Sequence, residues 1–135
     1  MKKILVGFDG SEGSEQALNR ALSLIDEFGE LILLAVIPSK KDRVFVDENM
    51  YQKMKKRAQV LLDDAIRDFG THELEVRGIV EEGDAAAKII DVANRERVDL
   101  IVLGSRGTTE IGQYLLGSIA NKVVQYAHKP VMVVR

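Results

Sequence analysis

Five short apolar runs alternate with four segments whose apolar residues recur at helical spacing, and this alternation limits the fold more than any other feature. The runs cover residues 3–8, 31–37, 74–80, 100–103 and 131–134. Residues 31–37 and 100–103 contain no polar side chain, which is typical of strands buried on both faces of a sheet. Residues 74–80 largely alternate apolar and polar positions, as a strand at a sheet edge does. The pattern predicts one α/β domain over residues 1–135, with a mostly parallel sheet and right-handed crossovers.

The helical segments lie between these runs, within residues 17–28, 50–69, 86–93 and 119–127. Gly29 is expected to end the first helix, which places Phe28 on that helix's apolar face. Met50 and Met54 share the apolar face of the second helix, so we expect both to be core residues. Asp84 stands where its side chain can cap the third helix.

Composition narrows the classes of function. The chain has 135 residues, a net charge of -2 and no cysteine. The small net charge gives no reason to expect a nucleic-acid or membrane surface, and the longest apolar runs fall well short of the roughly 18 residues of a membrane span. The lack of cysteine excludes disulfides and thiolate chemistry and suits the cytoplasm, where we expect the protein to stay.

Two glycine-bearing turns carry the candidate site. Asp9-Gly10-Ser11 follows the first apolar run, and residues 104–107 follow the fourth. In parallel α/β sheets, ligands bind outside the carboxyl ends of the strands, at the point where the winding reverses. We therefore expect the two turns, far apart in sequence, to face one crevice.

The second turn belongs to a longer glycine pattern that favours phosphate binding. Gly104 and Gly107 would let the backbone approach an anion, and Gly117-Ser118 would open a helix whose positive end attracts negative charge. Arg106 could add a positive side chain. The alternative is steric, because glycines are common in strand-to-helix turns and Ser118 could simply cap its helix.

Asp9 and Val36 are candidates to contact the ribose and the base of a nucleotide. Asp9 could hold ribose hydroxyls or a magnesium ion carried by the phosphates, although aspartate before Gly-Ser is also a routine turn residue. Val36, at the end of the second apolar run, offers an apolar wall for a base. We assign no catalytic residue and no dedicated metal site: the chain has no GxxxxGK[ST] loop, and His72 and His128 are interpreted as surface positions.

With these residues in place, the chain resembles the universal stress protein family almost from end to end. The resemblance is carried by ILVGFDGSEGSEQAL, by GDAAAKIIDVANRERVDLIVLGSRG and by the tail around KPVMVV. Its most specific element is the spacing G-x2-G-x9-G-S from Gly104 to Ser118, which is similar to the pattern of the family's ATP-binding branch. The resemblance implies a three-layer, Rossmann-like fold of the adenine nucleotide alpha hydrolase type, with five parallel strands in the order 3-2-1-4-5 and four helices.

The resemblance also implies the site and its ligand. Asp9 and Val36 would border the adenosine of ATP, whose phosphates would carry Mg²⁺ or Mn²⁺. The implied binding residues are Asp9, Gly10, Val36, Leu103, Gly104, Ser105, Arg106, Gly107, Gly117, Ser118 and Ile119. Ala120 departs from the family pattern, because a second hydroxyl often follows the Gly-Ser pair, and this weakens the expected γ-phosphate contacts.

The leading hypothesis is an ATP-binding stress-response regulator whose nucleotide occupancy is the signal. Hydrolysis is expected to be slow at most, because no general base is evident near the proposed phosphates. The resemblance implies a homodimer through Val131 to Val134, and an open apolar edge strand favours such pairing. Two alternatives stay open. One is an ATP-dependent activating enzyme of a related α/β class, which is disfavoured because the chain has no SGGxDS loop and no HxGH sequence. The other is a dimeric adaptor that binds another small ligand.

Overall fold

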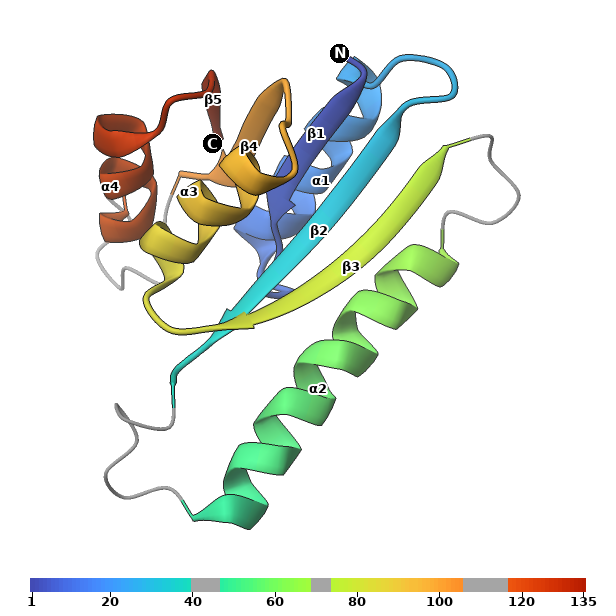
Figure 1. The fold of residues 1–135 in the computed structure, drawn as a ribbon. Coiled ribbons are helices and arrows are strands. Elements are labelled where there is room, and N and C mark those ends of the chain that lie inside the picture. Colours follow the sequence, from blue (N-terminus) through green and yellow to red (C-terminus); the bar gives the residue numbers. More distant parts are fainter. Residues whose placement is uncertain (40–46, 69–73, 106–116) are drawn as a thin grey trace.

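The computed structural model describes residues 1–39, 47–68, 74–105 and 117–135. Along the chain these residues form β1 (Lys3–Gly7), α1 (Glu12–Leu24), β2 (Glu30–Ile37), α2 (Glu48–Arg67), β3 (Glu75–Glu82), α3 (Ala85–Arg95), β4 (Leu100–Gly104), α4 (Ser118–Tyr126) and β5 (Val131–Val134) (Figure 1). The strands pair in parallel in the order β3-β2-β1-β4-β5. The predicted fold class and strand order are therefore confirmed.

The sheet separates two apolar layers. On one face, α1 and α2 pack against alternate strand residues that include Ile4, Val6 and Leu33. On the other face, α3 and α4 pack against the intervening residues, such as Leu5 and Ile32 (Figure 1). Because β1, β2 and β4 lie inside the sheet, both of their faces are buried, as the unbroken apolar runs predicted.

Side chains fix the starts of three helices. Ser11 caps α1, Asp47 caps α2 and Asp84 caps α3, each by accepting the amide hydrogen three residues later. The cap predicted at Asp84 is thus confirmed, with 3.0 Å from its Oδ2 to the Ala87 nitrogen. No described helix is long and apolar enough to cross a membrane.

Met50 is 49% exposed, so the prediction that it belongs to the core is wrong. The buried stripe of α2 runs through Tyr51, Ala58 and Leu62 rather than through Met50. Met50 is rotated about 100° from Tyr51 on the helix and therefore faces solvent. Met54 lies between these extremes and is half-buried.

The first helix ends at Leu24, earlier than predicted, and Phe28 does not lie on it. The Asp26 amide donates to the carbonyl of Met1 at 2.8 Å, which draws the chain away from the helix axis. Phe28 then adopts a left-handed backbone with φ of 63° and is 72% exposed. The spacing of apolar residues could not predict the early end of this helix, because Asp26 pairs with Met1, which precedes β1 in the sequence.

Replacing Phe28 with asparagine is expected to raise the free energy of unfolding by about 1 kcal/mol, because a bulky residue is strained in the left-handed region that asparagine tolerates. Urea unfolding followed by circular dichroism measures the change. Phe28→Ala is the matched control, since it removes the exposed ring and keeps the Cβ atom. An equal gain in both variants would assign the effect to the ring and contradict the backbone explanation.

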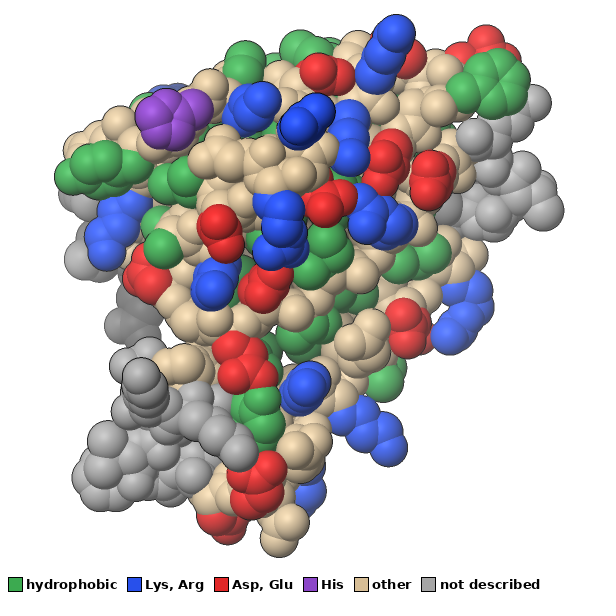
Figure 2. All heavy atoms as spheres, viewed as in Figure 1, with side chains coloured by type: hydrophobic (Ala, Val, Ile, Leu, Met, Phe, Trp, Pro, Cys, Tyr) green, Lys and Arg blue, Asp and Glu red, His purple; other side chains and the backbone are tan. Residues whose placement is uncertain are grey.

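Ion pairs bridge the amino ends of three strands. The Arg77 side chain on β3 bonds to Glu30 of β2, with 2.8 Å from Nε to Oε1, and also to Glu96 beyond α3. Lys3 of β1 lies 3.4 Å from Glu30 and 3.8 Å from Glu96. On the face seen in Figure 2, basic and acidic side chains are interspersed over the upper part of the molecule. The amino ends of these strands are therefore covered by paired charges.

The ion pair with Arg77 makes stability depend on pH. Hydrogen bonding from Arg77 lowers the pKa of Glu96. The ionised Glu96 therefore adds to the free energy of unfolding above the ordinary carboxyl pKa, and this stabilisation is lost as pH falls through the lowered pKa. We expect Glu96→Gln to cost about 0.5 to 1 kcal/mol at neutral pH and progressively less below about pH 4. Urea unfolding across this range is the measurement, with the exposed Glu27→Gln as control. A constant difference at every pH would contradict the account.

Candidate functional site

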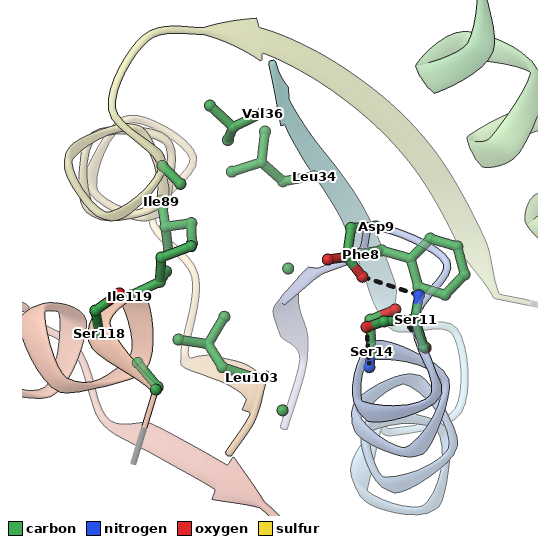
Figure 3. Close-up of a pocket in the computed structure, with 15 residues that line it drawn as sticks. Phe8, Asp9, Ser11, Ser14, Leu34, Val36, Ile89, Leu103, Ser118 and Ile119 are labelled. Atoms are coloured by element: carbon green, nitrogen blue, oxygen red, sulfur yellow. Dashed lines mark hydrogen bonds between the residues drawn. The ribbon is translucent and has the colours of Figure 1, made fainter. Parts of the chain in front are cut away.

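A pocket of about 420 Å³ opens at the carboxyl ends of β1 and β4 (Figure 3). Its lining comes from the β1–α1 turn, the end of β2 and the starts of α3 and α4. The lining residues are Gly7, Phe8, Asp9, Ser11, Ser14, Leu34, Val36, Ala85, Ile89, Leu103, Gly104, Gly117, Ser118, Ile119 and Ala120. The two turns singled out in the sequence thus face one cavity, at the point where the strand order reverses.

Most of the residues expected at the site line this pocket. They are Asp9, Val36, Leu103, Gly104, Gly117, Ser118 and Ile119. Gly10 and Ser105 adjoin the lining without belonging to it, and Arg106 and Gly107 lie outside the described residues. The sequence did not indicate six further lining residues, which are Gly7, Phe8, Ser14, Leu34, Ala85 and Ile89. Leu34 could have been found, since it precedes Val36 by two positions and so faces the same side of β2.

One wall of the pocket carries a carboxylate. The Ser11 amide donates to Asp9 Oδ1 at 2.9 Å, and the Ser14 hydroxyl donates to the Ser11 carbonyl at 2.9 Å. Burial raises the pKa of Asp9 and is the largest single influence, but hydrogen bonding, chiefly from Ser11, outweighs it and holds the pKa below its ordinary value. The side chain is therefore a charged acceptor at neutral pH, with room to accept a ligand hydroxyl.

The opposite wall is apolar. Leu34 and Val36 project from β2 toward Ile89 of α3, and Leu103 closes the floor from β4 (Figure 3). Leu34 and Leu103 are almost fully buried, while Val36 is half-buried at the pocket's edge. A flat apolar group can lie against this wall while a polar group attached to it reaches Asp9.

The third side of the pocket is the start of α4. Gly117 occupies the cap position and makes no side-chain cap, so Ser118 is the first helical residue and does not serve as the cap. The Gly117 amide donates to the Ser105 carbonyl at 2.6 Å, which ties the helix start to the end of β4. Ser118, Ile119 and Ala120 form the first turn of α4 and line the cavity. A helix start without a side-chain cap favours an anion at its amides.

Gly104 has a steric reason to be glycine. A Cβ atom at this position would lie 2.8 Å from both the carbonyl carbon and the oxygen of Gly13 in α1. The absence of a side chain therefore lets α1 pack closely on β4, and the steric alternative accounts for Gly104 without a ligand. This steric reason is established for Gly104 alone within the glycine pattern, because Gly107 lies outside the described residues.

Few ionisable groups lie in the described part of the pocket. Asp9 is the one ionisable side chain among the described lining residues. Within the described part of the chain, no three histidine, aspartate or glutamate side chains are close enough to hold a metal ion. His128 is exposed beyond α4, and His72 is outside the described residues.

Comparison with known proteins identifies the family. The sequence model of the universal stress protein family matches residues 1–135. The chain belongs to the universal stress protein family. Universal stress protein YxiE of Bacillus subtilis is 32% identical over 146 residues, which cover 98% of each chain. Universal stress protein MJ0577 of Methanocaldococcus jannaschii is 29% identical over 153 residues, covering 99% of this chain and 94% of its own. The solved structure of MJ0577 superposes with a TM-score of 0.83 over 98% of this chain and 94% of that one.

Proposed function

We propose that this universal stress protein binds ATP and that occupancy of the pocket by nucleotide is a regulatory signal. The observation that carries the proposal is the pocket itself, which joins an apolar wall, a charged acceptor and a helix start without a side-chain cap. These three features match the base, the ribose and the phosphates of a nucleotide.

The lining residues divide among the parts of the ligand. Val36 and Leu34 would hold the adenine, Asp9 would accept from the ribose hydroxyls, and the first turn of α4 at Ser118 would receive the phosphates. Arg106 and Gly107 would complete the phosphate contacts, as the glycine motif implies. Mg²⁺ or Mn²⁺ would accompany the phosphates and neutralise part of their charge; no described cluster of side chains is needed to hold it.

Two other universal stress proteins of the same fold were solved with an adenine nucleotide bound. One was solved in complex with cAMP, with 23% identity to this chain and a TM-score of 0.67. Another, from Arabidopsis thaliana, was solved with AMP bound, with 16% identity and a TM-score of 0.68. At these identities the likeness shows the shared fold alone, so the ligand of this chain is inferred from its own pocket.

A binding role fits the pocket better than rapid catalysis. Hydrolysis of ATP needs an oriented water in addition to charge stabilisation, and Asp9 is assigned here to the ribose. Release of bound ligand from gently purified protein, followed by mass spectrometry, tests the proposal: ATP or another adenine nucleotide is expected. A different small molecule would favour an adaptor for that ligand, and rapid ATP turnover would favour an activating enzyme.

The two edges of the sheet support the proposal of a homodimer through β5. Edge strand β3 carries Glu75, Arg77, Glu81 and Glu82 among its eight residues, whereas β5, Val131–Val134, carries no charge. Charged side chains discourage an edge strand from pairing with another chain, and apolar ones do not. The uncharged edge is therefore the one suited to pair with a second copy.

Val133→Lys is expected to convert the dimer to a monomer, because it adds a charge to the edge strand that would pair. Since Val133 also packs against the core, circular dichroism has to show that the variant is folded. Sedimentation equilibrium measures the mass of each species in solution. Val60→Lys is the matched control, since Val60 is 46% exposed on α2, far from β5 in the sheet order. A wild-type protein that sediments as a monomer, or a Val133→Lys variant that remains dimeric, would contradict the proposal.

A further inference from the structure

One face of α2 forms a second hollow, here named the α2 groove. It encloses about 500 Å³ and is lined by Lys53, Lys56, Arg57, Val60, Leu61 and Asp64. These positions recur at steps of three and four and so share one side of the helix. Val60 is 46% exposed and Leu61 is half-buried, which gives the groove an apolar floor that meets solvent.

The cations of the groove lack carboxylate partners among the residues that the structure describes. Lys53, Lys56 and Arg57 take part in none of the salt bridges formed between described residues, and the ion pair of Asp64 is with Arg67 at 3.3 Å. Arg77 and Arg95 are paired with carboxylates, whereas exposed cations such as Arg20 have no such partner among the described residues, and the groove differs from these single sites in bringing three such cations together. A protein with a net charge of -2 therefore concentrates uncompensated positive charge beside an exposed valine.

This combination fits an acidic peptide better than other anionic partners. Nucleic acid contacts usually involve more phosphates than three cations can neutralise, and they do not call for an apolar floor. A membrane-binding helix presents a broad apolar face, whereas the exposed apolar surface here centres on Val60. A peptide with carboxylates flanking one apolar side chain would match both the charge and the floor.

The groove also adjoins the nucleotide pocket. A Cβ atom at Gly10 would lie 2.9 Å from Leu61 Cδ1, so the floor of the groove touches the β1–α1 turn. Gly10 has a left-handed backbone, with φ of 82°, and follows Asp9 of the pocket directly. A ligand that moves Leu61 therefore acts on the same turn that orients the pocket's carboxylate.

We propose that the α2 groove docks an acidic partner peptide and that the Leu61–Gly10 contact couples this docking to occupancy of the nucleotide pocket. Docking stands on the groove alone, whereas its coupling to ATP rests on the proposed function. Through this coupling the partner peptide would bind the nucleotide-occupied protein and the empty protein with different affinities, so that its binding reports nucleotide occupancy.

Fluorescence anisotropy with a fluorescein-labelled peptide of repeating Glu-Glu-Leu-Leu tests the docking. We expect saturable binding to the wild-type protein, weakened about tenfold or more in Lys56→Glu/Arg57→Glu. Lys55→Glu is the control, because Lys55 is exposed on α2 but does not line the groove; it should change the affinity less than about twofold. Absent peptide binding, equal losses in both variants, or charge-dependent binding of oligo-dT or phosphatidylserine vesicles in place of the peptide would each overturn the proposal.

Coupling is tested by hydrogen exchange and by nucleotide. Peptide binding is expected to slow amide exchange in residues 8–14 of the wild-type protein. In Leu61→Ala, measured at peptide concentrations that saturate the variant, this protection should be absent. Saturating ATP with Mg²⁺ should shift the peptide affinity at least about twofold. Unchanged exchange, or an unchanged peptide affinity in protein shown to bind ATP, would overturn the coupling. If ATP does not bind, the proposed function fails, and the anisotropy and exchange results still decide docking and contact with the turn.

Discussion

The Gly104→Ala variant is expected to lose about 3 kcal/mol of its free energy of unfolding. Its new methyl group would lie 2.8 Å from the backbone carbon and oxygen of Gly13, far inside van der Waals contact. Backbone atoms cannot rotate away as a side chain can, so α1 has to move off β4. Urea unfolding followed by circular dichroism measures the loss.

Gly7→Ala is the matched control for this prediction. Its Cβ atom would approach Leu103 Cδ2 to 2.7 Å, but that atom is the end of a flexible side chain that can turn aside. We expect a smaller loss, of about 1 kcal/mol. Equal stability of the two variants would show that the contact between α1 and β4 does not require glycine, and Gly104 would then be explained by its ligand.

Asp9→Asn is expected to raise the dissociation constant for ATP about 10- to 100-fold, the value of a charge-assisted hydrogen bond. Asparagine keeps the shape of the side chain and its acceptor for the Ser11 amide, so the turn should survive. Because the pKa of Asp9 lies below its ordinary 3.8, the carboxylate stays charged at neutral pH. Titration of Asp9 should therefore not change the affinity of the wild-type protein for ATP between pH 6 and 8. The part of this affinity that comes from the Asp9 carboxylate should be lost only as pH falls through the lowered pKa.

Isothermal titration of adenosine, AMP and ATP separates two roles for Asp9. Contact with the ribose predicts the same factor of loss for all three ligands, whereas contact through a phosphate-bound metal ion predicts a loss for ATP alone. Glu12→Gln, an exposed carboxylate in the first turn of α1 outside the pocket lining, is the control and should leave binding unchanged. Wild-type affinity in Asp9→Asn would show that the carboxylate takes no part in binding.

The sequence was sufficient to predict the sheet because hydrophobic runs report burial directly. The unbroken run at 31–37 became the buried strand β2, and the interrupted run at 74–80 became the edge strand β3. The strand order itself came from resemblance to the family, since hydrophobicity does not specify which strands are neighbours. The structure and the family match confirm both.

The deviations arise where tertiary contacts act on local structure. The chain leaves the first helix before Phe28 because the Asp26 amide pairs with Met1, and Met50 faces solvent because α2 packs on the sheet through Tyr51 and Leu62. The same limit applies to the pocket. Asp9 and Gly117 could be proposed from their turns, whereas Ile89 of α3 enters the lining only through tertiary packing. Neither helical spacing nor turn chemistry carries that information.

Isothermal titration of ATP with excess Mg²⁺ into nucleotide-free wild-type protein is the decisive measurement of nucleotide binding. We expect a saturable heat with one ATP bound per chain, weakened in Asp9→Asn and unchanged in Glu12→Gln. Absence of binding at millimolar ATP, in protein shown by circular dichroism to be folded, would contradict the assignment of this pocket to a nucleotide.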